Sequence, residues 1–253
     1  MNRTDIDFDL LAAAPLKQAI AQVRFERHPE VSQPDFISGF RAALGGDFSR
    51  IEQAASNQII LGPLGEMQKT GEGGWALRSD DGWTVTVLES SVTLEAASYT
   101  RWSGFTDRLE TALAAMEQKI MPATEQRVGL RFVDEFREST VNSPAEWKGK
   151  IRPELLGAVL LSDFAEYVAV AEQRLVLNFP DGEVCLIRHG ALPSEPGTSA
   201  YVLDVDVSRE MKGVYDAAKV REEFGSFHER AKTLFRRSIT DEYFDELLTG
   251  EGK

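Results

Sequence analysis

The chain has 253 residues, of which 42% are hydrophobic and 27% are charged, so it has an ordinary globular composition and is long enough to bury a sizeable core. Its 41 acidic and 28 basic residues give a formal net charge of −13, which repels phosphate backbones and argues against sequence-independent nucleic-acid binding. The single cysteine, Cys185, excludes an internal disulfide framework and a cysteine-based zinc site.

The N-terminal sequence lacks the pattern of a signal peptide. Asp5, Asp7 and Asp9 precede an apolar stretch of only residues 10–14, which Pro15 interrupts. No segment approaches the ~20 apolar residues that a membrane-spanning helix requires. We therefore expect a cytoplasmic protein without a membrane partner.

Residues 1–122 have the hydrophobic periodicities of one α+β unit. Alternating apolar and polar residues predict a strand at 18–27, and apolar residues at helical spacing predict helices at 34–45 and 102–120. Asp81-Gly82 predicts a hairpin turn between the strands that flank it. Four strands are expected between the two helices, at 57–62, 73–79, 83–89 and 91–99.

Residues 123–253 have similar periodicities in a similar order. A strand at 127–137 is followed by an expected helix at 146–161, and a long amphipathic helix is expected at 215–238. Asp181-Gly182 again predicts a hairpin turn, and a short helix is expected after Thr240 as its N-cap. Four strands are expected between the two longer helices, at 166–172, 174–179, 183–189 and 200–208.

The parallel order of elements predicts an internal duplication. Val23-Arg24-Phe25 and Leu130-Arg131-Phe132 head the two series, each with an arginine on the polar side of its strand. We expect an α+β protein of two pseudo-repeated units, 1–122 and 123–253. Each unit would be a strand, a helix, a four-stranded antiparallel meander and a long helix, and the two would pack together into one globular body.

The best candidate site lies on the polar faces of two strands. Asp204 and Asp206 share the face opposite Leu203 and Val205, and Arg131 points outward from its own strand. If these strands were neighbours, Arg131 would pair with one of the two aspartates. Two carboxylates at this spacing would also suit Mg²⁺ in a nucleotide site. No third acidic ligand or phosphate-binding loop accompanies them, so we favour the structural pair and expect no metal and no cofactor.

His228 is the remaining candidate ligand-binding residue. It falls near the apolar stripe of the long helix at 215–238, four residues after Phe224. The three histidines of the chain have no metal-ligand spacing between them. A histidine at the edge of the core is the favoured interpretation, and a general base is the alternative. We expect no catalytic residue.

Short motifs span nearly the whole chain: Pro15-Leu16, Val23-Arg24-Phe25, Tyr99-Thr100-Arg101-Trp102 with Phe105, Arg127-Val128-Gly129-Leu130-Arg131-Phe132, Leu203-Asp204-Val205-Asp206, and Phe227-His228 leading through Phe235 to Ile239-Thr240. In this order they resemble a sporadically distributed family of uncharacterised bacterial proteins of about 250 residues. The resemblance implies no established activity or fold. The sporadic distribution looks like that of mobile defence or toxin–antitoxin genes.

The sequence therefore favours a non-enzymatic cytosolic binding protein, in a bacterial defence or toxin-neutralising system, whose partner is another protein or a small ligand. One alternative is a nucleotide- or metal-dependent enzyme or sensor that uses Arg131, Asp204 and Asp206. A second alternative is an acidic inhibitor that mimics DNA, although the acidic residues are dispersed: residues 1–122 carry a formal charge of −6 and residues 123–253 carry −7.

Overall fold

The computed structural model describes residues 11–45, 48–62, 65–161, 163, 165–194 and 197–250. Its α-helices are α1 (Pro34–Leu44), α2 (Trp102–Lys119), α3 (Pro153–Leu156), α4 (Ala217–Ser238) and α5 (Asp241–Thr249). Its strands are β1 (Leu16–Phe25), β2 (Arg50–Gly62), β3 (Gly65–Arg78), β4 (Trp83–Leu88), β5 (Ser91–Ala96), β6 (Thr124–Arg137), β7 (Ala171–Asn178), β8 (Val184–Pro193) and β9 (Ser199–Val214). No helix within these residues is both long and apolar enough to cross a membrane.

The described strands form one antiparallel sheet, and this corrects the expectation of two pseudo-repeated units packed together. The strand order is β2-β3-β4-β5-β1-β6-β9-β8-β7, so β1 and β6, which head the two expected units, are neighbours inside it. Unpaired backbone groups at the edge of a sheet favour pairing with a further strand. Edge pairing through β1 and β6 satisfies those groups and gives a single nine-stranded sheet.

The chain divides into two compact units. Unit 1 comprises Met1–Ala19, Leu130–Arg209 and Glu223–Lys253, and unit 2 comprises Ile20–Gly129 and Glu210–Glu222.

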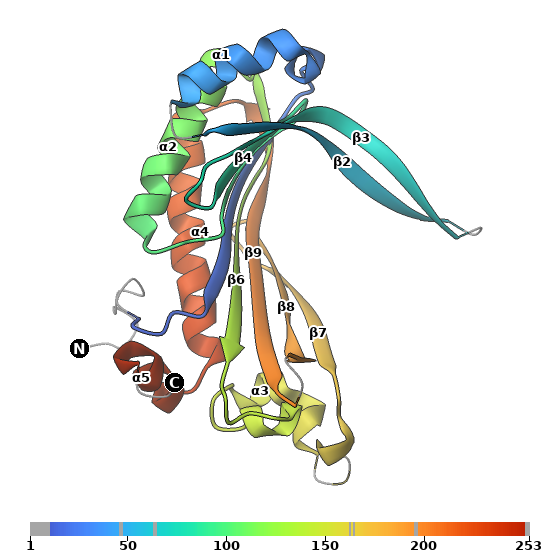
Figure 1. Ribbon diagram of the computed structural model, residues 1–253, viewed down its shortest axis with the longest axis vertical. Coiled ribbons are helices and arrows are strands. Elements are labelled where there is room, and N and C mark those ends of the chain that lie inside the picture. Colours follow the sequence, from blue (N-terminus) through green and yellow to red (C-terminus); the bar gives the residue numbers. More distant parts are fainter. Residues whose placement is uncertain are drawn as a thin grey trace. The chain divides into compact units, whose positions relative to one another are not determined.

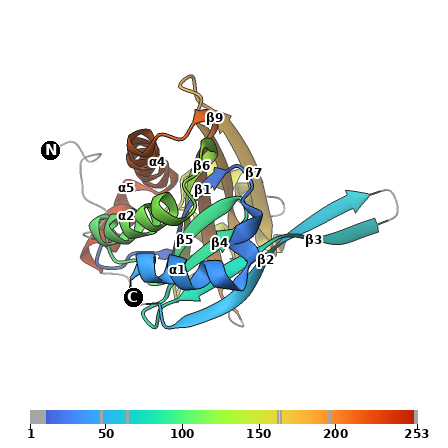
Figure 2. The same ribbon diagram turned by 90° about the horizontal axis from the view of Figure 1, so that it is seen from above.

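Unit 2 contains a four-stranded meander, as expected, with two helices on one side of β4 and β5 (Figure 2). Gly82 adopts a φ of 88° in the hairpin between β3 and β4, which confirms the turn predicted from Asp81-Gly82. The buried side chains alternate along β4, where Val85 and Val87 face the core with Phe105 of α2. The β2–β3 pair continues beyond the part of β3 that pairs with β4 (Figure 1).

Unit 1 contains a three-stranded meander, β7-β8-β9, in place of the four strands expected. The expected strands at 166–172 and 174–179 are a short 3₁₀ turn followed by β7. Gly182 adopts a φ of 88° in the β7–β8 hairpin, so the predicted Asp181-Gly182 turn is confirmed. The Thr240 hydroxyl accepts a hydrogen bond from Tyr243 N at 3.2 Å as the N-cap of α5.

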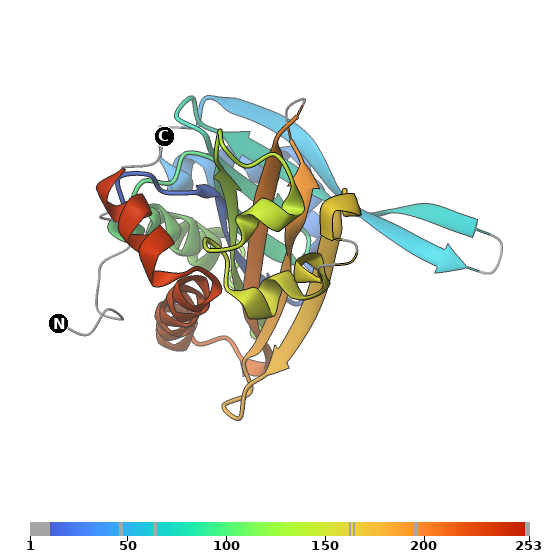
Figure 3. The same cartoon turned by 90° about the horizontal axis from the view of Figure 1, so that it is seen from below.

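The helix expected at 146–161 is divided into short pieces, of which α3 is the only α-helical turn within that range. Gly149 and Gly157 adopt φ values of 87° and 51°, which are left-handed conformations that end helices. Pro153 begins α3 instead of interrupting a longer helix. These pieces lie next to β8 (Figure 3).

The core of unit 1 lies between the sheet and α4. Leu203, Val205 and Val207 of β9 are buried, together with Cys185 and Ile187 of β8. At one end of this layer the ring of Phe136 packs against the rings of Trp147, Tyr201, Phe235 and Tyr243. The ring of Trp147 also packs against those of Tyr201 and Tyr243. Because alternate residues of a strand point to opposite faces, the even-numbered residues of β8 and β9 lie on the other face of the sheet.

Candidate functional site

A buried carboxylate lies at the centre of this second, polar face of unit 1. Asp204 of β9 accepts two hydrogen bonds from Arg131 of β6, from Nε at 2.7 Å and from Nη2 at 2.8 Å. Arg188 of β8 donates from Nη1 to the same carboxylate at 3.0 Å. The structure thus contains the cross-strand pair that the sequence predicts for Arg131, and it adds Arg188 as a second cation.

The three side chains differ in exposure. The Asp204 side chain is only 7% exposed, whereas the side chains of Arg131 and Arg188 are 37% and 48% exposed. A buried carboxylate requires charged hydrogen-bond donors, and the two guanidinium groups provide them while remaining open to solvent. Asp204 therefore fixes the positions of two partly exposed cations.

A third arginine extends this line of charges towards the edge of the sheet. Arg174 of β7 is directly opposite Arg188, which is directly opposite Asp204. Arg174 is exposed and makes no ion pair with any described residue. We call Arg174, Arg188, Asp204 and Arg131 the arginine row. Its formal charge is +2 in a chain whose net charge is −13.

Asp206 lies two residues beyond Asp204 on the same face, opposite Leu186 of β8. It is half-buried. No cluster of three His, Cys, Asp or Glu side chains suited to a metal ion occurs within the described residues. Both oxygens of Asp204 accept hydrogen bonds from guanidinium groups, so this carboxylate is engaged with arginines.

The structure does not bring His228 to the arginine row. The imidazole of His228 on α4 lies 6.1 Å from the ring of Phe132, measured between centroids. Phe132 is adjacent to Arg131 in β6, so the two side chains point to opposite faces of the sheet. His228 lies on the α4 side of the sheet, at the edge of the core, and its Nδ1 is 3.5 Å from the exposed carboxylate of Glu229.

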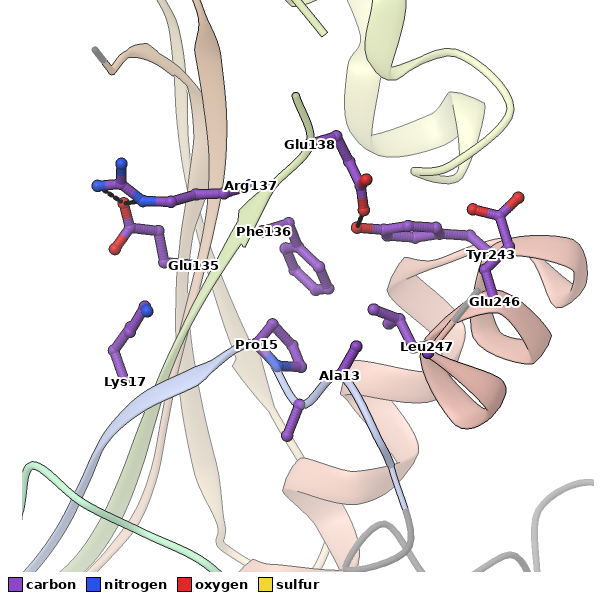
Figure 4. A pocket seen from close by; sticks show the side chains of 12 residues that line it. Ala13, Pro15, Lys17, Glu135, Phe136, Arg137, Glu138, Tyr243, Glu246 and Leu247 are labelled. Carbon is purple, nitrogen blue, oxygen red and sulfur yellow. Dashed lines mark hydrogen bonds and ion pairs between the residues drawn. The ribbon is translucent and has the colours of Figure 1, made fainter. Parts of the chain in front are cut away.

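A pocket of about 290 Å³ lies elsewhere in unit 1, where the end of β6 meets α5 and the segment before β1 (Figure 4). The Tyr243 hydroxyl donates to Glu138 at 2.6 Å, and Lys150 lies 4.4 Å above the Tyr243 ring and 2.7 Å from Glu246. Burial and the hydrogen bond to the Glu138 carboxylate raise the pKa of Tyr243, so its hydroxyl stays protonated. Sequence reasoning missed the pocket because three segments that are distant in the sequence form it.

The core of unit 1 also contains an acidic side chain that sequence reasoning missed. Asp134 lies on β6 between Phe132 and Phe136, on the face that packs against α4, and it is buried. Burial raises the pKa of Asp134 to about 8, because the charged carboxylate loses its hydration. The alternation of β6 could have revealed it, because Asp134 occupies an apolar position of that pattern.

No protein-family model matches the chain, and no curated protein matches it either. The resemblance to a sporadically distributed bacterial family stays a prediction.

Proposed function

We propose that this protein is a non-enzymatic binding protein that recognises a short acidic segment of another protein through the arginine row. The observation that carries the proposal is that Arg131 and Arg188 both donate to Asp204 while their side chains remain 37% and 48% exposed, respectively. The planar guanidinium group presents several N–H donors in a fork that matches a carboxylate. Two such groups, one on each side of Asp204, would bind acidic side chains of a partner.

The anchoring of these arginines favours binding. A free arginine side chain loses rotamer entropy when it is immobilised against a partner. Arg131 already makes two hydrogen bonds and Arg188 one to the buried carboxylate of Asp204. Part of the loss of rotamer entropy of these two side chains has therefore already occurred in the free protein.

The charge of the whole chain limits the kind of partner. A net charge of −13 repels a uniformly acidic protein, whereas the local charge of +2 on the arginine row attracts acidic groups. Beyond the Debye length, about 8 Å at physiological ionic strength, exposed charges are screened from one another. A short acidic segment bound at the arginine row would therefore be attracted by its arginines more strongly than it would be repelled by carboxylates farther away.

The chemistry of the arginine row favours binding over catalysis. Arginine stays protonated at physiological pH, and Asp204 accepts hydrogen bonds at both oxygens. A nucleotide- or metal-dependent enzyme that used Arg131, Asp204 and Asp206 would need these oxygens for an ion. We extend the proposal to a cytoplasmic protein with a role in defence or toxin neutralisation, on sequence patterns alone.

Peptide binding tests the proposal directly. Fluorescence anisotropy would compare a labelled peptide of alternating Glu and Asp with the same peptide of Gln and Asn. We expect only the acidic peptide to bind, and Arg188→Gln to weaken its binding about tenfold, or about 1.4 kcal/mol. Arg237→Gln is the control, because Arg237 is an exposed arginine on α4 outside the arginine row.

Equal binding of the two peptides, or equal binding by wild type and Arg188→Gln, would overturn the proposal. A thermal-shift measurement with ATP and Mg²⁺ separates the enzyme or sensor alternative. A ligand that binds only the native state raises the melting temperature. A rise that Arg188→Gln removes would favour a nucleotide ligand over a protein segment.

A further inference from the structure

The terminal strand of the sheet has an open edge. Among the described strands, β7 is last in the strand order and pairs with β8 alone. Five of its eight residues are exposed. Edge strands present unpaired backbone N–H and C=O groups, to which another strand can bind.

The β7–β8 hairpin shows which backbone groups face the open edge. Phe179 N donates to Glu183 O at 2.8 Å, and the register continues with Asn178 opposite Val184. In an antiparallel pair, residues that exchange hydrogen bonds alternate with residues that do not. The odd-numbered residues of β7 therefore bond to β8. The backbone groups of Glu172, Arg174 and Val176 point outward.

The same edge is unusually apolar for an exposed strand. Val176 is 52% exposed, and Leu175 and Val170 are also exposed. Tyr167, in the turn before β7, is 75% exposed. Protected edges usually carry charges, prolines or bulges. β7 carries two exposed charges, Glu172 and Arg174, but it contains no proline and its register against β8 has no bulge. This edge is suited to pairing with another strand.

We propose that two copies of the chain associate through β7 as antiparallel strands, with Gln173 of one copy opposite Gln173 of the other. This register places Glu172 opposite Arg174 of the second copy, and the two-fold symmetry repeats the pair. It also places Val170 opposite Val176 of the second copy, again twice. Opposite charges and β-branched side chains in directly opposite positions stabilise a strand pair.

The charges on β7 select this register among the neighbouring ones. A shift that centres the pair on Arg174 would bring two arginines directly opposite each other, which is destabilising. A shift that centres it on Leu175 would place Glu172 opposite Asn178. Only the register centred on Gln173 pairs Glu172 with Arg174. Neither side chain has an ion-pair partner among the described residues.

Backbone geometry agrees with the same register. Glu172, Arg174 and Val176 carry the outward N–H and C=O groups, and the register pairs outward-facing residues with one another. Gln173 then sits in a pair without hydrogen bonds, where Cα atoms are about 4.5 Å apart. Its side chain donates to Leu155 O at 2.9 Å on the other face of the sheet, away from the Glu172–Arg174 pairs.

Sedimentation velocity over a range of protein concentrations tests the association. We expect wild type to form a concentration-dependent dimer and Arg174→Glu to weaken it at least tenfold, because Glu172 would then face a carboxylate. The double variant Glu172→Arg/Arg174→Glu should restore the dimer, since it reverses each charge pair. Arg237→Glu makes the same charge change on α4 and should leave the dimer intact.

Disulfide cross-linking tests the register. Under mild oxidation, Gln173→Cys should give a covalent dimer, and Leu175→Cys should not, because Leu175 faces Ala171 of the second copy. Cys185 is buried and does not compete. A monomer at all concentrations, a dimer that tolerates both Arg174→Glu and Val176→Lys, or faster cross-linking of Leu175→Cys than of Gln173→Cys would overturn the proposal. Circular dichroism would show that each variant is folded.

Discussion

Arg230 of α4 donates from Nε to Glu183 at 2.8 Å, and its guanidinium group lies 3.9 Å from the centre of the Phe179 ring. Glu183 follows the β7–β8 turn, its side chain has no exposed surface, and it also accepts from Ser226 Oγ at 2.6 Å. A buried carboxylate thus joins the hairpin to α4.

Loss of this carboxylate should destabilise the protein strongly. We expect Glu183→Ala to lower the free energy of unfolding by about 3 kcal/mol, because it removes the acceptor of Arg230 Nε and of the Ser226 hydroxyl. Urea denaturation would measure the change. Glu229→Ala is the control, since Glu229 pairs with Lys232 on the exposed surface of the same helix, and it should cost under about 0.5 kcal/mol. Equal losses would contradict the structural role of Glu183.

Asp134 should make the protein less stable as the pH rises. Burial raises its pKa to about 8 from an ordinary value of 3.8, so the folded protein holds a proton that the unfolded chain releases. Its stabilising contribution is complete below about pH 4 and is lost as the pH rises to 8. The slope is at most about 1.4 kcal/mol per pH unit.

Asp134→Asn should remove this dependence and be more stable than wild type at pH 8. Urea denaturation at pH 5 and pH 8 would measure it. Asp107→Asn, at an exposed position of α2, is the matched control and should keep the pH dependence of wild type. If the free energies of unfolding of wild type and Asp134→Asn differed by the same amount at both pH values, Asp134 would not be the group with the raised pKa.

Glu26 should contribute stability that acid removes. Burial alone would raise its pKa, but hydrogen bonds from Ala123 N, Thr124 N and the Thr124 hydroxyl lower it to about 2. The contribution is therefore present above pH 4.5 and is lost as the pH falls towards 2. Thermal melts between pH 2 and 6 should show a weaker acid dependence for Glu26→Gln. An unchanged profile would contradict these bonds.

Gly190 of β8 should not tolerate a side chain. A Cβ atom there would overlap Ala171 O of β7, and backbone cannot move aside as a side-chain end can. We expect Gly190→Ala to cost about 1–3 kcal/mol, as overpacking does. Gly213→Ala is the control, because a Cβ at Gly213 has open space around it. Similar melting temperatures for the two variants would show that the strands accommodate the methyl group.

Local sequence signals predicted the local structure well. The Asp-Gly pairs at 81–82 and 181–182 form the hairpins, and Arg131 pairs with Asp204. Each depends on turn chemistry or on strand alternation, which a single segment carries. No single segment determines which strands distant in the sequence pair with each other. The periodicity of β1 and of β6 therefore could not predict that they are neighbours in one sheet.

The remaining differences have similar causes. Gly149 and Gly157 interrupt the helix expected at 146–161, and their left-handed conformations outweigh its apolar spacing. Arg188 joins Asp204 because the register of β8 against β9 places it there. The periodicity of β8 and of β9 shows which face each residue occupies. It does not determine which residue of β8 lies opposite Asp204.

The terminal position of β7 has a consequence for the arginine row. A two-fold axis between antiparallel edge strands is perpendicular to the sheet, so both copies would present their arginine rows on one side. Arg174 of each copy would pair with Glu172 of the other at the junction, and the Arg131 and Arg188 guanidinium groups of both copies would face the same side. A partner carrying two acidic segments would then bind bivalently, with an avidity that neither row has alone.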